Sequence, residues 1–347
     1  FGFVMELSKS RYFTLIIDEF QEFYSVNPAV FSEMQHIWDS NKENSKLNLV
    51  LCGSVYTLMS KIFENAKEPL FGRATQKIEL KAFDIGTLEE ILYDFSPQYT
   101  KDDLLAFYLF TGGVAKYVEL LVQAKAFTFE AMCNEILAEN SLFLNEGKNV
   151  LIEEFGKDYG NYFSILSLIA TGKTSRVEIE SILQIQTGGF LDRLEKDYNL
   201  IEKIRPVLAK PGSRSLKYEI EDNFLKFWFR FIYKYHSAVE AGNFTYLKKI
   251  VQRDYSTYSG KLLEKYFIEK LKLEKKYNTI GTYWERGNQN EIDIVAVDDF
   301  YKTVLFAEVK RNASNISIEK LKEKSSKLLY RYKNYQVNYR GLSLEDM

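Results

Sequence analysis

Three side chains near the carboxyl terminus have the types and spacing that divalent-metal phosphodiester chemistry uses. Asp293 lies near the start of one apolar run, and Glu308 and Lys310 stand two residues apart in the next run. Residues alternate faces along a strand, so Glu308 and Lys310 share a face, and Asp293 reaches the same place if the two strands pair. Glu264, in the helical stretch that precedes them, is a fourth candidate. The spacing predicts one cluster of acids beside a lysine.

The chemistry of such a cluster follows from its donor atoms. Carboxylate oxygens are the ligands that Mg²⁺ prefers, and an adjacent lysine can place or deprotonate the attacking water. We assign Asp293, Glu308 and Glu264 as metal ligands and Lys310 as the water-positioning cation, with Asp293, Glu308 and Lys310 catalytic. The alternative interpretation is a pair of solvated acids beside a basic strand end.

A second acidic pair follows an apolar run near the amino terminus. Asp18 and Glu19 follow directly after the apolar run 15–17. This is the pattern of a Walker B strand, in which the first carboxylate holds Mg²⁺ and the second polarises the water that attacks a nucleotide γ-phosphate. We therefore predict that Asp18 binds Mg²⁺ and that Glu19 is catalytic. A buried strand that ends in solvated acids is the alternative.

Two further residues could complete this nucleotide site. Ser54 follows the next apolar run, 47–52, and the carboxyl ends of neighbouring parallel strands form the ligand-binding edge of an open α/β sheet. Ser54 is therefore a candidate sensor of the phosphate. Arg73, in the sequence Phe-Gly-Arg, is a candidate basic finger, and a plain surface charge is the alternative.

A glycine-rich phosphate loop that ends in Gly-Lys-Ser/Thr should precede these residues. The sequence Gly-Lys-Thr at 172–174 does not qualify, because Ser167 replaces the glycine five residues before it and the preceding segment is helical. We therefore expect the chain as given to bind ATP poorly or not at all. ATP becomes a ligand only if such a loop precedes the first residue.

The order of expected elements divides the chain into four parts. Apolar strands at 12–17, 47–52 and 75–80, with a helix at 29–40, predict a parallel sheet covered on both faces. Helical periodicity dominates from 87 to 144. Three helices and two short strands then predict a winged helix-turn-helix, followed by an aromatic packing helix. The predicted ranges of these later elements are 162–170, 177–183, 189–198, 200–205, 216–220 and 224–233.

The charge is unevenly distributed along the 347 residues. From Thr245 onward there are 20 basic and 14 acidic residues, a net charge of +6, against −8 before it. This basic carboxyl-terminal part, including the lysine-rich helix expected near 318–332, is where nucleic acid would dock. The third helix of the winged segment carries three acids against two basic residues, which favours packing or partner binding over base reading.

The composition excludes several classes of protein. Cys52 and Cys133 are far apart and lack metal-ligand spacing, which argues against a disulfide framework and a zinc site. The most apolar run, 224–233, is about half as long as a membrane span requires. With no recognisable signal peptide, we expect a cytoplasmic globular protein with 46% apolar residues and no membrane partner.

The order of motifs resembles the archaeal and bacterial AAA+/STAND-like P-loop ATPases that carry a winged helix and a carboxyl-terminal PD-(D/E)XK nuclease-like domain. The resemblance rests on Asp18-Glu19-Phe-Gln, Gly53-Ser54, Gly72-Arg73, the run 111–117, and the acids and lysine at 291–293 and 308–310. It implies an α/β chain with a partial P-loop core at 1–86, a helical lid at 87–150, a winged helix and packing helix at 155–240, and a restriction-endonuclease-like domain at 245–340.

The resemblance also implies the cofactors and partners. They are Mg²⁺, ATP where the phosphate loop is present, and nucleic acid, with DNA favoured; a protein partner or a homo-oligomer is also compatible with it. The leading hypothesis is an ATPase-family protein whose nucleotide module controls a Mg²⁺-dependent nuclease. The alternative is a non-catalytic regulatory or signalling ATPase whose tail holds a partner or DNA.

Overall fold

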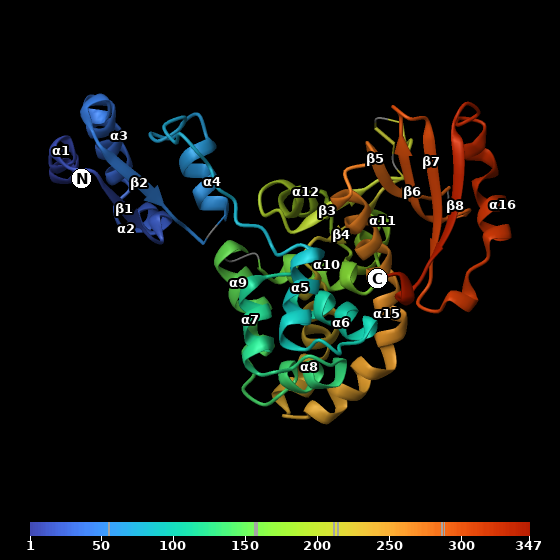
Figure 1. Cartoon of the computed structure of the whole chain (residues 1–347). Coiled ribbons are helices and arrows are strands. Elements are labelled where there is room, and N and C mark those ends of the chain that lie inside the picture. Colours follow the sequence, from blue (N-terminus) through green and yellow to red (C-terminus); the bar gives the residue numbers. More distant parts are fainter. Residues whose placement is uncertain (55, 156–158, 211, 214, 286, 288) are drawn as a thin grey trace. The chain divides into compact units, whose positions relative to one another are not determined.

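The computed structural model describes residues 1–54, 56–155, 159–210, 212–213, 215–285, 287 and 289–347. The fold is mixed α/β, with helices and small sheets, and it divides into two compact units (Figure 1). The first unit comprises residues 1–80 and short segments near residues 151 and 196, and the second contains the remainder. This division is coarser than the four parts expected from the sequence, which stay a prediction.

The first unit is built on two parallel strands, β1 (Phe13–Ile17) and β2 (Leu47–Leu51). Helix α3 (Ala29–Asn41) connects them, as parallel pairing requires a crossover. Alternate residues point to opposite faces, and one face of the pair packs on a core around Phe20 and Phe31. The unit is completed by α1 (Gly2–Ser10), α2 (Phe23–Val26) and α4 (Tyr56–Glu64).

Two expectations for this unit are wrong. The sheet is not covered on both faces, because Ile16 and Val50 on the second face are 63% and 37% exposed. The segment 75–80 is not a strand, and Ile78 and Leu80 within it are 74% and 93% exposed. Strand preference reflects packing on a pleated surface, and these residues have no described strand to pair with and no core beneath them.

The second unit begins with five helices over the region where helical periodicity was expected. Their bounds are α5 (Ile85–Phe95), α6 (Lys101–Thr111), α7 (Ala115–Gln123), α8 (Phe129–Ile136) and α9 (Leu142–Phe155). Helix α6 is central, since residues 104–110 are all buried. It begins at a capping box between Thr100 and Asp103 and ends at Gly112, whose φ of 57° suits glycine.

Three short helices and a two-stranded antiparallel sheet follow. They are α10 (Tyr159–Ala170), α11 (Arg176–Leu183), α12 (Gly188–Lys196), β3 (Ile201–Ile204) and β4 (Lys217–Ile220). The order of elements agrees with the expected order, and the assignment as a winged helix stays a prediction. Asp192 and Glu195 of α12 both form ion pairs with Lys203 of β3. Two of the acids of that helix are therefore paired with a basic residue of the adjacent strand.

The aromatic segment after β4 is helical but irregular. It contains α13 (Asn223–Phe227), one π-helical turn (Trp228–Ile232), a 3₁₀ turn (Tyr233–Tyr235) and α14 (His236–Glu240). Trp228 donates from Nε1 to the Leu144 carbonyl at 2.9 Å and lies against Gly147 of α9. No helix among the described residues is both long enough and apolar enough to cross a membrane.

The carboxyl-terminal part joins the 30-residue helix α15 (Phe244–Leu273) to a four-stranded sheet. The strands lie in the order β5, β6, β7, β8, with the first two pairings antiparallel and the last parallel. Helix α16 (Ile318–Leu329) connects β7 to β8 and packs beside the sheet (Figure 1). The strand bounds are β5 (Thr279–Tyr283), β6 (Ile292–Asp298), β7 (Thr303–Val309) and β8 (Gln336–Leu342).

Candidate functional site

The carboxyl-terminal acids stand at one end of the β6–β7 hairpin. The ladder pairs Ile294 with Ala307, so Asp293 and Glu308 lie across from one another one residue further on. Residues that face one another in an antiparallel pair share a face of the sheet. The register therefore explains how two acids fifteen positions apart come together, and it requires the tertiary pairing that the sequence pattern only suggested.

Both acids contact the same lysine. The Lys310 ammonium lies 3.1 Å from Asp293 Oδ2 and 3.7 Å from Glu308 Oε1. The Asp293 and Glu308 residues are 8% and 6% exposed, whereas the Lys310 side chain is 38% exposed. Buried carboxylates need compensating charge and hydrogen bonds, and Lys310 supplies the charge from the side that opens to water.

Backbone amides complete the hydrogen bonding of the two acids. The Val309 amide donates to Asp293 Oδ2 at 2.8 Å, and the Ser317 amide donates to Glu308 Oε2 at 3.0 Å. The Lys324 ammonium reaches Glu308 Oε1 at 3.4 Å. Ser317 is the N-cap of α16, so the start of that helix holds Glu308 in place.

The titration behaviour of the cluster reflects burial and charge. Burial, followed by the negative charge of Asp293, raises the pKa of Glu264 to about 8, with Lys261 and Lys310 opposing the shift. Burial alone would raise the pKa of Glu308, but the Ser317 amide and two lysines outweigh it and lower that pKa. Burial would lower the pKa of Lys310, and the facing acids raise it instead. Near neutral pH, Lys310 is therefore protonated and Glu264 largely neutral.

The donor set of this cluster fits Mg²⁺ in chemistry. Asp293, Glu308 and Glu264 offer hard oxygen atoms, and the charge of Asp293, second to burial, raises the pKa of Glu264. Over the ranges that the structure describes, no three acid, histidine or cysteine side chains already stand at metal-ligand spacing. The Lys310 ammonium occupies the point between the two acids, so an ion held by both requires that lysine to move aside.

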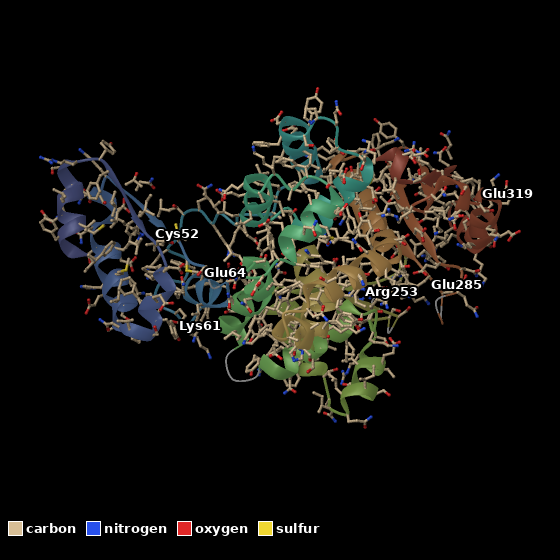
Figure 2. The ribbon with its side chains drawn as sticks, turned by 90° about the horizontal axis from the view of Figure 1, so that it is seen from below. Cys52, Lys61, Glu64, Arg253, Glu285 and Glu319 are labelled. Atoms are coloured by element: carbon tan, nitrogen blue, oxygen red, sulfur yellow. The ribbon has the colours of Figure 1, made fainter. Side chains whose placement is uncertain are left out.

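The amino-terminal acids form a second cluster at the carboxyl ends of β1 and β2. The Cys52 amide donates to the Ile17 carbonyl at 2.9 Å, and the Phe20 amide donates to the Cys52 carbonyl at 2.8 Å (Figure 2 labels Cys52). These bonds fix Glu19 and Ser54 beside one another, and Ser54 Oγ donates to Glu19 Oε2 at 2.8 Å.

Glu19 is held by hydrogen bonds on a strained backbone. Its φ is 49°, a left-handed value that is uncommon outside glycine. The Gln21 side-chain amide donates to the same oxygen as Ser54, and these two bonds, that of Gln21 first, lower the pKa of Glu19. The Glu19 amide donates to Asp18 Oδ1 at 2.9 Å, which places the two acids together.

Gln21 was not among the residues assigned from the sequence. It is 1% exposed, and its Oε1 has no hydrogen-bond partner in the part of the chain that the structure describes. A Cβ added to Gly53 would lie 2.3 Å from that oxygen, so glycine makes room for it. The sequence feature that could have identified Gln21 is its position three residues after Asp18. In the structure it lies in the 3₁₀ turn Phe20–Glu22.

Arg73 is engaged away from these acids. Its guanidinium makes a two-pronged contact with Asp39 of α3, with Nη2 at 2.8 Å from Oδ2 and Nε at 3.1 Å from Oδ1. Nη1 donates to the Phe71 carbonyl at 3.0 Å, and the pair with Arg73 lowers the pKa of Asp39. The contacts that the structure gives Arg73 are therefore with α3 and its own loop rather than with Glu19 or Ser54.

Comparison with known proteins gives matches of three kinds. The DUF234 family, described as archaea bacterial proteins of unknown function, matches residues 228–325. The solved structure of the Walker-type ATPase PABY2304 of Pyrococcus abyssi is 17% identical with a TM-score of 0.49, and the match covers 65% of each chain. The uncharacterized protein MJECL04 of Methanocaldococcus jannaschii is 31% identical over 326 residues, which are 91% of this chain and 70% of that protein. The chain therefore belongs to the same protein family as the Methanocaldococcus jannaschii protein.

Proposed function

We propose that this chain belongs to an ATPase-family protein in which a nucleotide-binding module is coupled to a Mg²⁺-dependent, nuclease-like DNA-processing domain. One observation carries the nuclease part. Asp293 and Glu308, from neighbouring strands, contact one lysine at 3.1 and 3.7 Å, and the charge of Asp293 acts on Glu264. Two or three acids beside a lysine are the groups that phosphodiester hydrolysis requires.

Each residue has a role in this proposal. Asp293, Glu308 and Glu264 would hold Mg²⁺, which when bound supplies a Lewis acid for the phosphate and lowers the pKa of its water. Lys310 positions the attacking water and offsets the negative charge of the phosphate. Ser317 and Lys324 position Glu308 through the contacts at 3.0 and 3.4 Å. The net positive charge from Thr245 onward would attract the polyanionic substrate.

The nucleotide-binding part of the proposal rests on the amino-terminal cluster. Asp18 would bind Mg²⁺, Glu19 would polarise water, and Ser54, which donates to Glu19 at 2.8 Å, would sense the terminal phosphate. Glu19 is ionised near neutral pH, and the hydrogen bonds that lower its pKa fix the orientation of its carboxylate. ATP binding further requires a phosphate loop, and Arg73 as a basic finger would have to leave Asp39.

A second candidate function is a non-catalytic regulatory ATPase whose carboxyl-terminal part only holds a partner or DNA. The position of Lys310 favours it, because an ammonium between two acids also describes an ion pair that only stabilises the fold. Calorimetric titration with Mg²⁺ separates the two candidates. The nuclease predicts binding that Asp293→Asn weakens, whereas the scaffold predicts no binding at this cluster.

Cleavage tests the proposal directly. With Mg²⁺ or Mn²⁺, we expect the protein to cut plasmid or oligonucleotide DNA, and Asp293→Asn or Lys310→Ala to reduce the rate by at least a hundredfold, since each removes a group from the reacting centre. Glu323→Gln, at an exposed acid of the same helix α16, is the matched control and should leave the rate unchanged. Equal rates for the wild type and Asp293→Asn would overturn the nuclease assignment.

A further inference from the structure

The end of the carboxyl-terminal sheet away from the acids is formed by three adjoining loops, 274–278, 298–302 and 330–335, which we name the aromatic end. Backbone and side-chain hydrogen bonds join them. The Asn278 amide donates to the Val297 carbonyl at 2.9 Å, and the Gln336 amide donates to the Lys302 carbonyl at 2.8 Å. Strand β7 separates this end from Glu308 by about 17 Å, at roughly 3.3 Å per residue.

The two acids of the loop 298–302, Asp298 and Asp299, stabilise the loop through hydrogen bonds. Asp298, which is 5% exposed, accepts from the Phe300 amide at 2.9 Å and from the Tyr301 amide at 3.0 Å. Asp299 accepts from the Tyr335 hydroxyl at 2.7 Å, and this bond, followed by one from Asn278, lowers its pKa. The turn is therefore fixed by its own carboxylates.

Three aromatic rings of these loops are exposed, whereas Tyr332 of the loop 330–335 is buried in the core. Phe300, Tyr301 and Tyr330 are 84%, 74% and 75% exposed. The Phe300 and Tyr301 rings contact only edge to face, with centroids 4.9 Å apart. Folding gains nothing from leaving large rings in water, and grouped exposed rings mark a contact surface more often than single ones do.

Lysines lie against two tyrosine rings of these loops, those of Tyr330 and Tyr335. The ammonium of Lys333 lies 3.9 Å from the centre of the Tyr330 ring, and that of Lys302 lies 5.1 Å from the centre of the Tyr335 ring. Among the exposed charged residues of the three loops the basic ones outnumber the acidic ones, and the carboxylate of Asp299 is already hydrogen-bonded. The exposed basic residues are Lys275, Lys276, Lys302, Arg331 and Lys333.

We propose that the aromatic end binds single-stranded nucleic acid. Exposed rings offer a face on which unpaired bases stack, and lysines beside the rings can contact the phosphates between those bases. A duplex hides its base faces, so it would engage only the lysines. The proposal takes from the proposed function only the class of substrate, and it places a binding surface for unpaired bases about one strand length from the acids.

Fluorescence anisotropy with labelled oligonucleotides in EDTA tests this without any cleavage. We expect a 20-nucleotide single strand to bind at least tenfold more tightly than its duplex. Phe300→Ser, Tyr301→Ser and Tyr330→Ser should each weaken single-strand binding by on the order of tenfold, because one stacked base is lost. The matched control is Tyr12→Ser, which removes a ring that is 83% exposed with Lys46 at 5.3 Å.

Three outcomes would overturn the proposal. They are equal loss with Tyr12→Ser, duplex binding as tight as single-strand binding, and ring substitutions that change only the sedimentation of the protein alone, which would assign the surface to self-association. The outcomes that contradict the nuclease proposal differ from those that contradict this surface. Ring-dependent binding without metal-dependent cleavage counts against the nuclease alone, and cleavage with ring-independent binding counts against this surface alone.

Discussion

At the scale of single residues, the two acidic clusters use different means to hold their charge. Glu19 receives two neutral hydrogen-bond donors, Gln21 and Ser54, whereas Glu308 combines a backbone amide with two lysines. A neutral donor leaves the net charge of the cluster negative, as the proposed Mg²⁺ site would require. Lys310 instead offsets the negative charge of both neighbouring acids.

Arg73 and Asp39 give a residue-scale prediction about pH. The contact with Arg73 lowers the pKa of Asp39, so the pair stabilises the fold above the unfolded pKa of about 3.9 and this contribution is lost as the pH falls below that value. Arg73→Gln should raise the pKa of Asp39 toward its ordinary value, measured by carboxyl-carbon NMR titration. It should also lower the melting temperature at pH 7, and by less as the pH falls through the folded-state pKa of Asp39.

The control for this prediction is Arg176→Gln, which breaks a separate ion pair with Glu180. It should leave the titration of Asp39 unchanged. If Arg73→Gln leaves the pKa of Asp39 depressed, the two-pronged contact is not its cause, and Arg73 becomes available for the role of a basic finger.

At the scale of elements, helix packing depends on small residues at fixed points. Helix α9 contacts the π-helical turn at Gly147, where a Cβ would lie 2.4 Å from the Trp228 ring. Arg311, the residue after Lys310, links α6 to α15, because its guanidinium donates to Asp102 of α6 at 2.7 Å and to Ser259 of α15 at 2.5 Å. The helices that begin the second unit are therefore tied to the segment that carries the acids.

Gly147→Ala is the prediction at this scale. Alanine favours a helix over glycine by about 1 kcal/mol, but overpacking a closed contact costs about 1–3 kcal/mol, and the rigid Trp228 ring cannot yield easily. We therefore expect a net loss of stability, measured by chemical denaturation followed through tryptophan fluorescence. Gly260→Ala in α15 is the matched control, because nothing lies within 4 Å of its added Cβ. Equal stability of the two variants would contradict the packing argument.

At the scale of the whole molecule, basic and acidic residues are unevenly distributed along the chain. The net charge of +6 from Thr245 onward includes the lysines of α16 and of the aromatic end. Counterion release makes binding of single strands salt-dependent, with a slope of about 0.7 per phosphate contact. The number of contacts can therefore be counted from salt titrations.

Salt dependence gives the prediction at this scale. Lys302→Gln and Lys333→Gln should each lower the slope of log affinity against log salt by about 0.7 and weaken single strands of any sequence alike, because each removes one phosphate contact. Lys46→Gln, a lysine beside the exposed Tyr12 ring, should leave the slope unchanged. The measurement is anisotropy between 50 and 200 mM salt, and an unchanged slope for both lysine variants would exclude their contact with phosphate.

The sequence by itself determined the residue types of both clusters and most of the elements that carry them. Alternating or continuous apolar runs predicted β1, β2, β6 and β7, and the acids stand at the ends of those runs. These are local properties, because the periodicity of apolar residues that predicts a strand or a helix involves only residues close together in the sequence. The exposed segment 75–80 shows the limit, since strand preference is not realised where no partner strand is described.

Only the tertiary structure decided which groups meet. The placing of Lys310 between Asp293 and Glu308, the engagement of Arg73 by Asp39, and the unpaired Gln21 oxygen beside Gly53 all depend on residues distant in sequence. At the aromatic end, Phe300 and Tyr301 are exposed on a turn whose amides are held by Asp298. Such contacts are fixed by strand register and helix packing, which residue type and local period leave open.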